Sequence, residues 1–101
     1  MTELELYTLL KSLNMPVAYD HFVNMDDLPG IVYRNATDNV FYADDVAYYL
    51  QNQFEVELIT KYKDLDTEEA LEDLFTYNDI AFEKTEYFND AERVFLITYT
   101  I

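Results

Sequence analysis

The sequence predicts an α+β domain in which an antiparallel, twisted sheet of about four strands carries two helices packed on one face. Three observations predict it: a leucine stripe near the start, a long apolar–polar alternation in the middle, and an acidic amphipathic segment followed by two β-rich segments. The chain has 101 residues, half of them apolar, so residues 1–101 are expected to form one domain with its own hydrophobic core.

The first helix is predicted by a capping box and a stripe of leucines. Thr2 and Glu5 have the spacing at which a hydroxyl and a carboxylate satisfy the free amides at a helix start. Pro16 is expected to end the helix, because the residue before a proline avoids helical geometry. Apolar residues recur between them at i, i+3, i+4 and i+7, on one helix face: Leu6, Leu9, Leu10 and Leu13.

Two short strands are expected next, over residues 17–22 and 31–34, with a turn at Pro29-Gly30 between them. A long strand is then expected over residues 48–62, where apolar and polar residues alternate as in a strand with one solvent-exposed face. At about 3.3 Å per residue it spans roughly 50 Å, which is long enough for this central strand to project as a hairpin arm.

A second helix is predicted from Asp66, whose spacing to Glu69 is that of another capping box. Acidic residues in this first turn favour the positive end of the helix dipole. The helix is expected to end at Tyr77-Asn78. Its buried stripe is expected to consist of Ala70, Leu71, Leu74 and Phe75.

A β-hairpin is predicted for the last part of the sequence. Residues 80–88 and 93–101 are β-rich, and Asn89-Asp90-Ala91-Glu92 between them has the composition of a hairpin turn. Alternation in the second segment is expected to bring four apolar side chains to one face: Phe95, Ile97, Tyr99 and Ile101.

Charge is the strongest global feature of the sequence. Twenty-one acidic residues face six basic ones, giving a formal net charge of -15. Binding to nucleic acid depends on Lys and Arg, so this balance indicates solubility, a basic partner, or a surface that does not hold DNA. Ten Tyr and seven Phe residues favour an assembling protein, because aromatic side chains are enriched at interfaces.

No catalytic or cofactor site is predicted, and we do not expect an enzyme. The chain has no cysteine and one glycine, which excludes a thiolate site and a glycine-rich phosphate loop. The only histidine, His21, is adjacent to Asp20 in a predicted strand, so the two side chains point to opposite faces. A serine triad would need this histidine to reach a positioned serine, and the only serine, Ser12, is expected at a surface position of the first helix. No signal segment and no membrane-spanning segment are expected.

The segment from Asp38 to Leu50, DNVFYADDVAYYL, places aromatic residues between acidic clusters. Its aspartates could supply oxygen ligands for calcium, but their spacing is not that of an EF-hand loop and the central glycine is missing. No metal site is therefore predicted. We expect a subunit or partner interface instead, formed by Asp38, Phe41, Tyr42, Asp44, Asp45, Tyr48 and Tyr49.

A run of short motifs extends over most of the chain. A short helix and a proline precede PGIVY at residues 29–33, DNVFYAD at 38–44 and VELITKYKD at 56–64. EEALEDLF at 68–75 and FEKTE at 82–86 complete the run. In composition and order it resembles the tail terminator, tail completion or minor capsid proteins of the head-tail joining region in tailed phages of Gram-positive bacteria.

The resemblance implies a twisted sheet flanked by helices and a ring of identical subunits, six in the related proteins. Such a ring caps the tail tube and joins the tail to the head connector of the virion, after assembly in the host cytoplasm. The implied partners are further copies of the chain, the tail tube protein and a head-completion or connector protein. DNA passes through the channel without specific binding, no membrane is involved, and no cofactor or catalytic residue is implied.

Two other functions stay open from the sequence. One is an acidic DNA mimic that inhibits a host nuclease or regulator, which needs carboxylates spaced along a surface like phosphates. Many acidic residues of this chain are instead expected at caps and turns. The other is a head-completion (stopper) protein of the same joining region, which would share partners but sit closer to the head.

Overall fold

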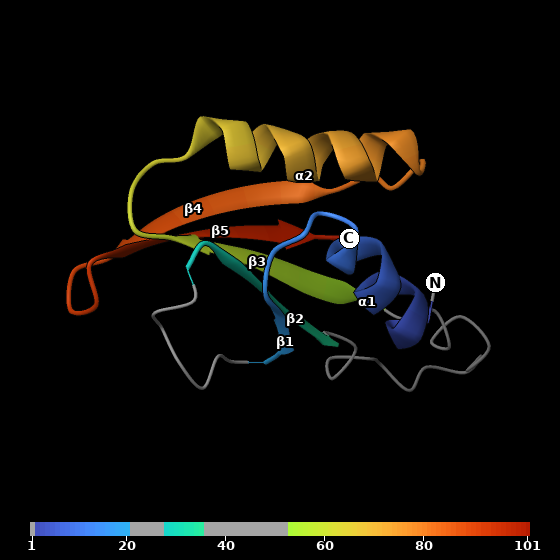
Figure 1. The fold of residues 1–101 in the computed structure, drawn as a ribbon, viewed down its shortest axis with the longest axis horizontal. Helices are drawn as coiled ribbons and strands as arrows, with labels where there is room; N and C mark the ends of the chain where they lie inside the picture. The colour runs from blue at the N-terminus through green and yellow to red at the C-terminus, as the bar shows by residue number, and fades with distance from the viewer. Residues whose placement is uncertain (1, 21–27, 36–52) are drawn as a thin grey trace, which may run out of the picture.

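The computed structural model describes residues 2–20, 28–35 and 53–101. Within these residues the predicted α+β class is confirmed: both helices contribute to one core cluster on a single face of one sheet (Figure 1). The strand order is β1-β2-β3-β5-β4. The elements are α1 (Glu3–Lys11), β1 (Val17–Tyr19), β2 (Gly30–Asn35), β3 (Phe54–Thr60), α2 (Leu65–Tyr77), β4 (Glu83–Asn89) and β5 (Val94–Thr100).

The sheet has five strands and is mixed, which corrects the expected antiparallel sheet of about four strands. β1 runs parallel to β2, with Val17 paired to Ile31, whereas the other neighbouring strands are antiparallel. The Ile31 amide donates to the Pro16 carbonyl at 2.8 Å, which extends the parallel pairing. Parallel strands usually need a crossover of about a dozen residues or more, and only residues 20–29 connect these two, so the sequence pattern favoured antiparallel neighbours.

The start of α1 is as predicted, but its end is not. The Thr2 hydroxyl accepts from the Glu5 amide at 3.1 Å, and the Thr2 amide donates to the Glu5 carboxylate at 3.1 Å. The helix already ends at Lys11, before Pro16, because the chain turns away at Asn14, where φ is 60°. In the leucine stripe, Leu6 and Leu10 are fully buried while Leu9 and Leu13 are partly buried.

The middle strands differ from expectation at their ends. Gly30 does not form a turn, because it is the first residue of β2, has no positive φ and pairs with Ile59. β3 ends at Thr60, and Tyr62 lies beyond the strand with 66% of its surface exposed. Residues 48–52 of the predicted long strand, and with them the predicted arm, lie outside the described residues.

The second helix begins earlier than predicted. Asp64, not Asp66, is the N-cap: its carboxylate accepts from the Thr67 amide at 3.2 Å and from the Thr67 hydroxyl at 2.7 Å. The buried face is rotated too, since Leu74 is only partly buried and Ala70 is exposed. Its buried residues are Glu68, Leu71 and Phe75. The predicted end at Tyr77-Asn78 is confirmed.

The C-terminal hairpin is confirmed, but its turn is residues 90–93, one residue later than expected, because Asn89 still pairs with Val94. The Asn89 side chain accepts from the amides of Ala91 at 3.0 Å and Glu92 at 3.2 Å, and Arg93 takes a φ of 58°. β4 starts at Glu83 rather than residue 80, because residues 80–82 lead from the helix into the strand. The predicted shared face is also confirmed: the core cluster includes Phe95, Ile97, Tyr99 and Ile101.

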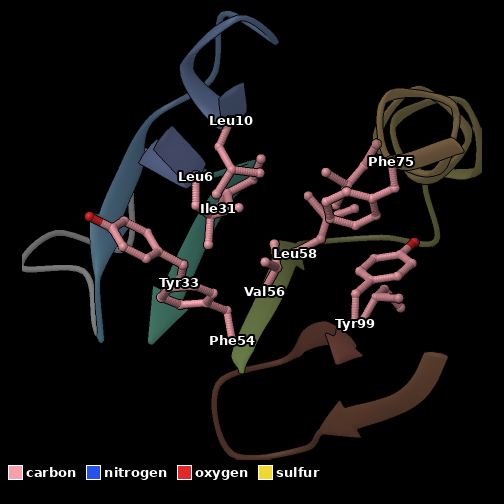
Figure 2. Close-up of a cluster of buried hydrophobic side chains, with 11 residues drawn as sticks. Leu6, Leu10, Ile31, Tyr33, Phe54, Val56, Leu58, Phe75 and Tyr99 are labelled. Atoms are coloured by element: carbon pink, nitrogen blue, oxygen red, sulfur yellow. The ribbon is translucent and has the colours of Figure 1, made fainter. Parts of the chain in front are cut away.

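The core lies between this sheet face and both helices (Figure 2). Leu6 and Leu10 of α1 lie over Ile31 of β2, and Phe75 of α2 lies near Leu58 and Tyr99. The rings of Phe75 and Tyr99 are 5.6 Å apart between centroids, in an edge-on arrangement. α1 is therefore held over the β1–β2 side of the sheet and α2 over the other side.

Candidate functional site

Aromatic and apolar side chains are exposed around the β4–β5 hairpin. We call this surface the hairpin patch and define it by Tyr62, Leu65, Tyr87 and Phe88, which are all exposed. Tyr87 and Phe88 lie at the same end of the sheet but on opposite faces: Phe88 pairs with Phe95 on the face covered by the helices, and Tyr87 pairs with Leu96 on the other face. The Phe88 and Phe95 rings are 4.8 Å apart, so Phe88 is fixed at the surface by its neighbour.

A second exposed patch surrounds α1. We call it the α1 patch and define it by Leu4, Tyr7, Tyr19 and Tyr33. The Tyr33 ring is its buried centre, 6.2 Å from the Tyr7 ring and 5.2 Å from the Tyr19 ring. Burial raises the pKa of Tyr33, and the charge of Glu3 acts in the same direction. A shallow hollow of about 410 Å³ lies between Leu4, Tyr7, Tyr33 and Glu3.

The two patches lie at opposite ends of the molecule. β1 and β4 are the outer strands of the described sheet, with α1 beside β1 and the hairpin formed by β4. In Figure 1 the longest axis is horizontal, and the hairpin turn lies at the far left whereas α1 lies at the right. A second molecule can therefore contact one patch without covering the other.

A network of lysines and carboxylates holds α2 against β4, next to the hairpin patch. Glu68 is only 3% exposed, and its carboxylate lies 2.9 Å from the Nζ of Lys63 and 2.9 Å from the Nζ of Lys84. Lys63 also pairs with Glu86, and Lys84 lies 2.7 Å from the Glu72 carboxylate. The helix and the edge strand are thereby joined by side chains from both.

Tyr99 completes this network from the adjacent strand. Its hydroxyl donates to the Glu72 carboxylate at 2.7 Å, beneath Lys84, whose Nζ lies 5.9 Å from the centre of the Tyr99 ring. Burial, and then the hydrogen bond to Glu72, raise the pKa of Tyr99. The tyrosine therefore remains a neutral hydrogen-bond donor at physiological pH.

The carboxylates of the network are held in the ionised form. Burial raises the pKa of Glu68, but the hydrogen bonds from Lys63 and Lys84 outweigh it, and the net pKa lies below the usual value. The pKa of Glu72 is lowered in the same way, with the hydrogen bonds from Lys84 and Tyr99 opposing burial. Both groups are thus ionic anchors, and neither is a proton donor near neutral pH.

Arg34 forms a separate charged group on the sheet face opposite the helices. Its guanidinium lies 3.4 Å from Asp20, 3.4 Å from Glu55 and 3.8 Å from Glu57. Asp20 is thus an ion-pair partner of Arg34, whereas His21 lies outside the described residues.

Comparison with known protein families, curated proteins and solved structures finds no match to this chain. The resemblance to phage head-tail joining proteins thus rests on the residue pattern alone.

The predicted interface residues lie outside the described part of the chain. Asp38, Phe41, Tyr42, Asp44, Asp45, Tyr48 and Tyr49 all fall in residues 36–52, so that interface stays a prediction. Ser12 is exposed, and its hydroxyl donates to the Leu9 carbonyl at 2.6 Å. Residues 2–20, 28–35 and 53–101 contain no group of three or more side chains placed to hold a metal ion. Nor does any helix in those ranges have the length and apolar character needed to cross a membrane.

Sequence reasoning missed both patches and the lysine–carboxylate network. A partial signal for the network was present, because Glu68 and Glu72 are spaced i, i+4 and share a helix face with Leu71 and Phe75. In so acidic a helix these glutamates were indistinguishable from solvent-facing ones. Only the fold brings Lys84, from a later strand, to them.

Proposed function

We propose that this chain is a structural virion protein that forms a ring, of six subunits as in the family it resembles. The ring caps the phage tail tube and joins the tail to the head connector. Its partners are further copies of the chain, the tail tube protein and a head-completion or connector protein. It performs no chemistry of its own.

One observation carries this proposal: a small acidic domain exposes apolar and aromatic side chains at both ends of its longest axis. Large exposed aromatic side chains are favoured at protein interfaces, since they bury much area with little loss of conformational entropy. A ring needs contacts in which one surface meets a different surface of the next copy, and two separate patches meet that need.

The distribution of charge supports a channel that does not retain DNA. Of the six basic residues, Arg34, Lys63 and Lys84 form ion pairs with carboxylates of the same chain. Fewer positive charges are then free to neutralise phosphates, while the net charge is -15. Repulsion from such a surface favours passage of the genome over binding.

Electron microscopy of the purified chain, alone and mixed with tail tubes, tests the proposal. Rings that attach to tube ends are expected. A strictly monomeric chain that leaves tubes untouched and binds a nuclease tightly would replace the proposal with the DNA mimic. Deletion of the gene in the phage separates the remaining roles: tubes of abnormal length indicate a terminator, whereas normal tails beside leaking heads indicate a stopper.

A further inference from the structure

We infer that the outer edge of β1 pairs antiparallel with β1 of a second copy of this chain, around a two-fold axis at Ala18. Two five-stranded sheets then form one continuous sheet. The inference goes beyond the proposed function, because a two-fold contact closes on two copies and does not build a ring. It rests on the backbone groups at this edge, on the lack of charge in β1 and on the residues that the pairing brings together.

β1 presents open backbone groups at the outer edge of the described sheet. Amides and carbonyls along a strand point alternately toward one neighbour and toward the other. The Pro16 carbonyl accepts from β2 and the Asp20 amide donates to β2, each at 2.8 Å, so the even-numbered residues face β2. The backbone groups of Val17 and Tyr19 therefore point away from β2, to the side on which the described sheet has no further strand.

The two outer strands of the described sheet differ in their protection against strand addition. β4 carries Glu83, Lys84 and Glu86, and charged side chains on an outer strand oppose pairing with another strand. The sequence of β1, VAY, contains no charged residue. Of these two edges, the β1 edge is therefore the one that admits a further strand.

β1 is complementary to itself in an antiparallel arrangement. With Ala18 opposite Ala18 of the second copy, Val17 lies opposite Tyr19 and exchanges both backbone hydrogen bonds with it. Tyr19 does the same with Val17 of the second copy. An aromatic residue opposite a β-branched one is a favourable cross-strand pair, and both side chains lie on the sheet face that carries the helices. A second β1 thus satisfies the open backbone groups of the first.

The charges around β1 are compatible with this pairing, although the net charge of the chain is -15. Asp20 lies opposite Pro16 of the second copy, and its carboxylate is 3.4 Å from Arg34 of its own chain. Glu3 lies beside Tyr33 of the inner strand β2. More distant charges are screened by salt over about 10 Å at 0.1 M ionic strength. Higher salt is therefore expected to strengthen this dimer, whereas it would weaken the binding of a basic partner.

Cysteine cross-linking tests the register, because the natural chain contains no cysteine. Ala18 and its counterpart form a pair without mutual hydrogen bonds, with Cα atoms about 4.5 Å apart, which a disulfide can span. Ala18→Cys is expected to give at least tenfold more disulfide-linked dimer under mild oxidation than Thr85→Cys. Thr85 is the matched control, because it lies in the middle of the other outer strand and on the same sheet face as Ala18.

Charged variants test the two-fold axis. Ala18→Lys and Ala18→Glu each place like charges directly opposite each other, so each variant alone is expected to form at least tenfold less dimer than the natural chain. A mixture of the two is expected to restore a dimer that contains one copy of each, which native mass spectrometry detects. Circular dichroism establishes that both variants are folded, and if either is not, the Ala18→Cys comparison decides.

Hydrogen exchange tests the strand edge itself. As the concentration of the natural chain rises, the amides of Val17 and Tyr19 are expected to exchange at least tenfold more slowly. The amide of Ala18 is the internal control, because it faces β2 and is already bonded within one copy. Slowing that is equal at all three amides would contradict pairing at this edge.

Each outcome bears on one proposal or the other. A natural chain that is monomeric at every concentration, with no Ala18→Cys dimer, would overturn the strand pairing. Protection of Val17 and Tyr19 that appears only when tail tubes are added would also overturn it, and would assign the edge to a strand of the tube protein. Rings on tube ends without the Ala18→Cys dimer would leave the proposed function intact and overturn this inference. The dimer in a chain that never binds tubes would support this inference and contradict the proposed function.

Discussion

The hydroxyl of the fully buried Tyr99, near the end of β5, donates a hydrogen bond of 2.7 Å to the carboxylate of Glu72 in α2. The same carboxylate forms an ion pair with Lys84 of β4. A tyrosine in the core is therefore the point at which the apolar cluster meets the lysine–carboxylate network.

Tyr99→Phe is expected to lower the free energy of unfolding by about 1.5 kcal/mol, since it removes one hydrogen bond to a charged group and leaves no cavity. Urea denaturation measures the change. Tyr77→Phe, on the exposed end of α2, is the matched control and is expected to change stability by less than about 0.5 kcal/mol. Equal stability of the wild type and Tyr99→Phe would mean that this hydrogen bond contributes nothing.

Lys63 and Lys84 are expected to be coupled through Glu68. Either lysine alone still neutralises the buried carboxylate, whereas Lys63→Met with Lys84→Met leaves it unpaired. The double substitution is expected to cost about 1–3 kcal/mol more than the sum of the single ones. A double-mutant cycle by urea denaturation measures this excess.

The control for that cycle is the same set of substitutions in a Glu68→Gln background. The excess is expected to vanish there, because no buried charge remains to be neutralised. Additive costs in the natural background would contradict the coupling.

Stability is expected to fall at acidic pH in a way that depends on Glu68 and Glu72. Their pKa values are lowered in the folded chain, so the stability they contribute is fully present above the unfolded value of 4.5. It is lost as pH falls through the folded pKa values, because the unfolded state then binds more protons.

Urea midpoints between pH 7 and pH 3 measure this loss for the wild type and for Glu68→Gln with Glu72→Gln. The variant is expected to lose less stability over that range, and comparison of the two chains cancels the effect of the other carboxylates. At alkaline pH, Lys63 and Lys84 have the corresponding effect: their raised pKa values give stability that is present below 10.5 and lost as pH rises through the folded values. If the urea midpoints of both proteins fall equally between pH 7 and pH 3, the network does not titrate as described.

The position of the α2 cap gives a further prediction. Asp64→Ala is expected to cost about 1 kcal/mol, because it removes the acceptor of the Thr67 amide and hydroxyl. Asp66→Ala is expected to cost only about 0.3 kcal/mol, the contribution of a surface charge to the helix dipole. Thermal unfolding measures the stability of the two variants. A larger loss of stability for Asp66→Ala than for Asp64→Ala would show that Asp66 is the N-cap.

Features that depend on neighbouring residues were predictable from the sequence. The capping box of Thr2 and Glu5 and the hairpin turn at Asn89 are fixed by contacts within a few residues. The alternating face of β5 was predictable for the same reason, since side chains in a strand alternate regardless of which strand lies beside it.

Features that depend on distant partners were not predictable. The parallel pairing of Val17 with Ile31 could not be predicted, because it depends on the path of the connection between the two strands and not on the residues of either strand. The burial of Glu68 depends on Lys84, which reaches it only when β4 lies beneath α2. The exposure of Tyr87 depends on β4 being the outer strand, which alternation within that strand does not reveal.

β4, an outer strand of the described sheet, carries Glu83, Lys84 and Glu86 in its first half and Tyr87 and Phe88 next to the turn. Charged side chains on an outer strand hinder the addition of a further strand from another molecule. Uncontrolled strand-by-strand growth of the kind that builds amyloid is therefore opposed along most of β4, even though its apolar end invites contact. Within the seven residues of β4, the charged half thus opposes fibril formation, while the apolar half remains available for contact with another protein.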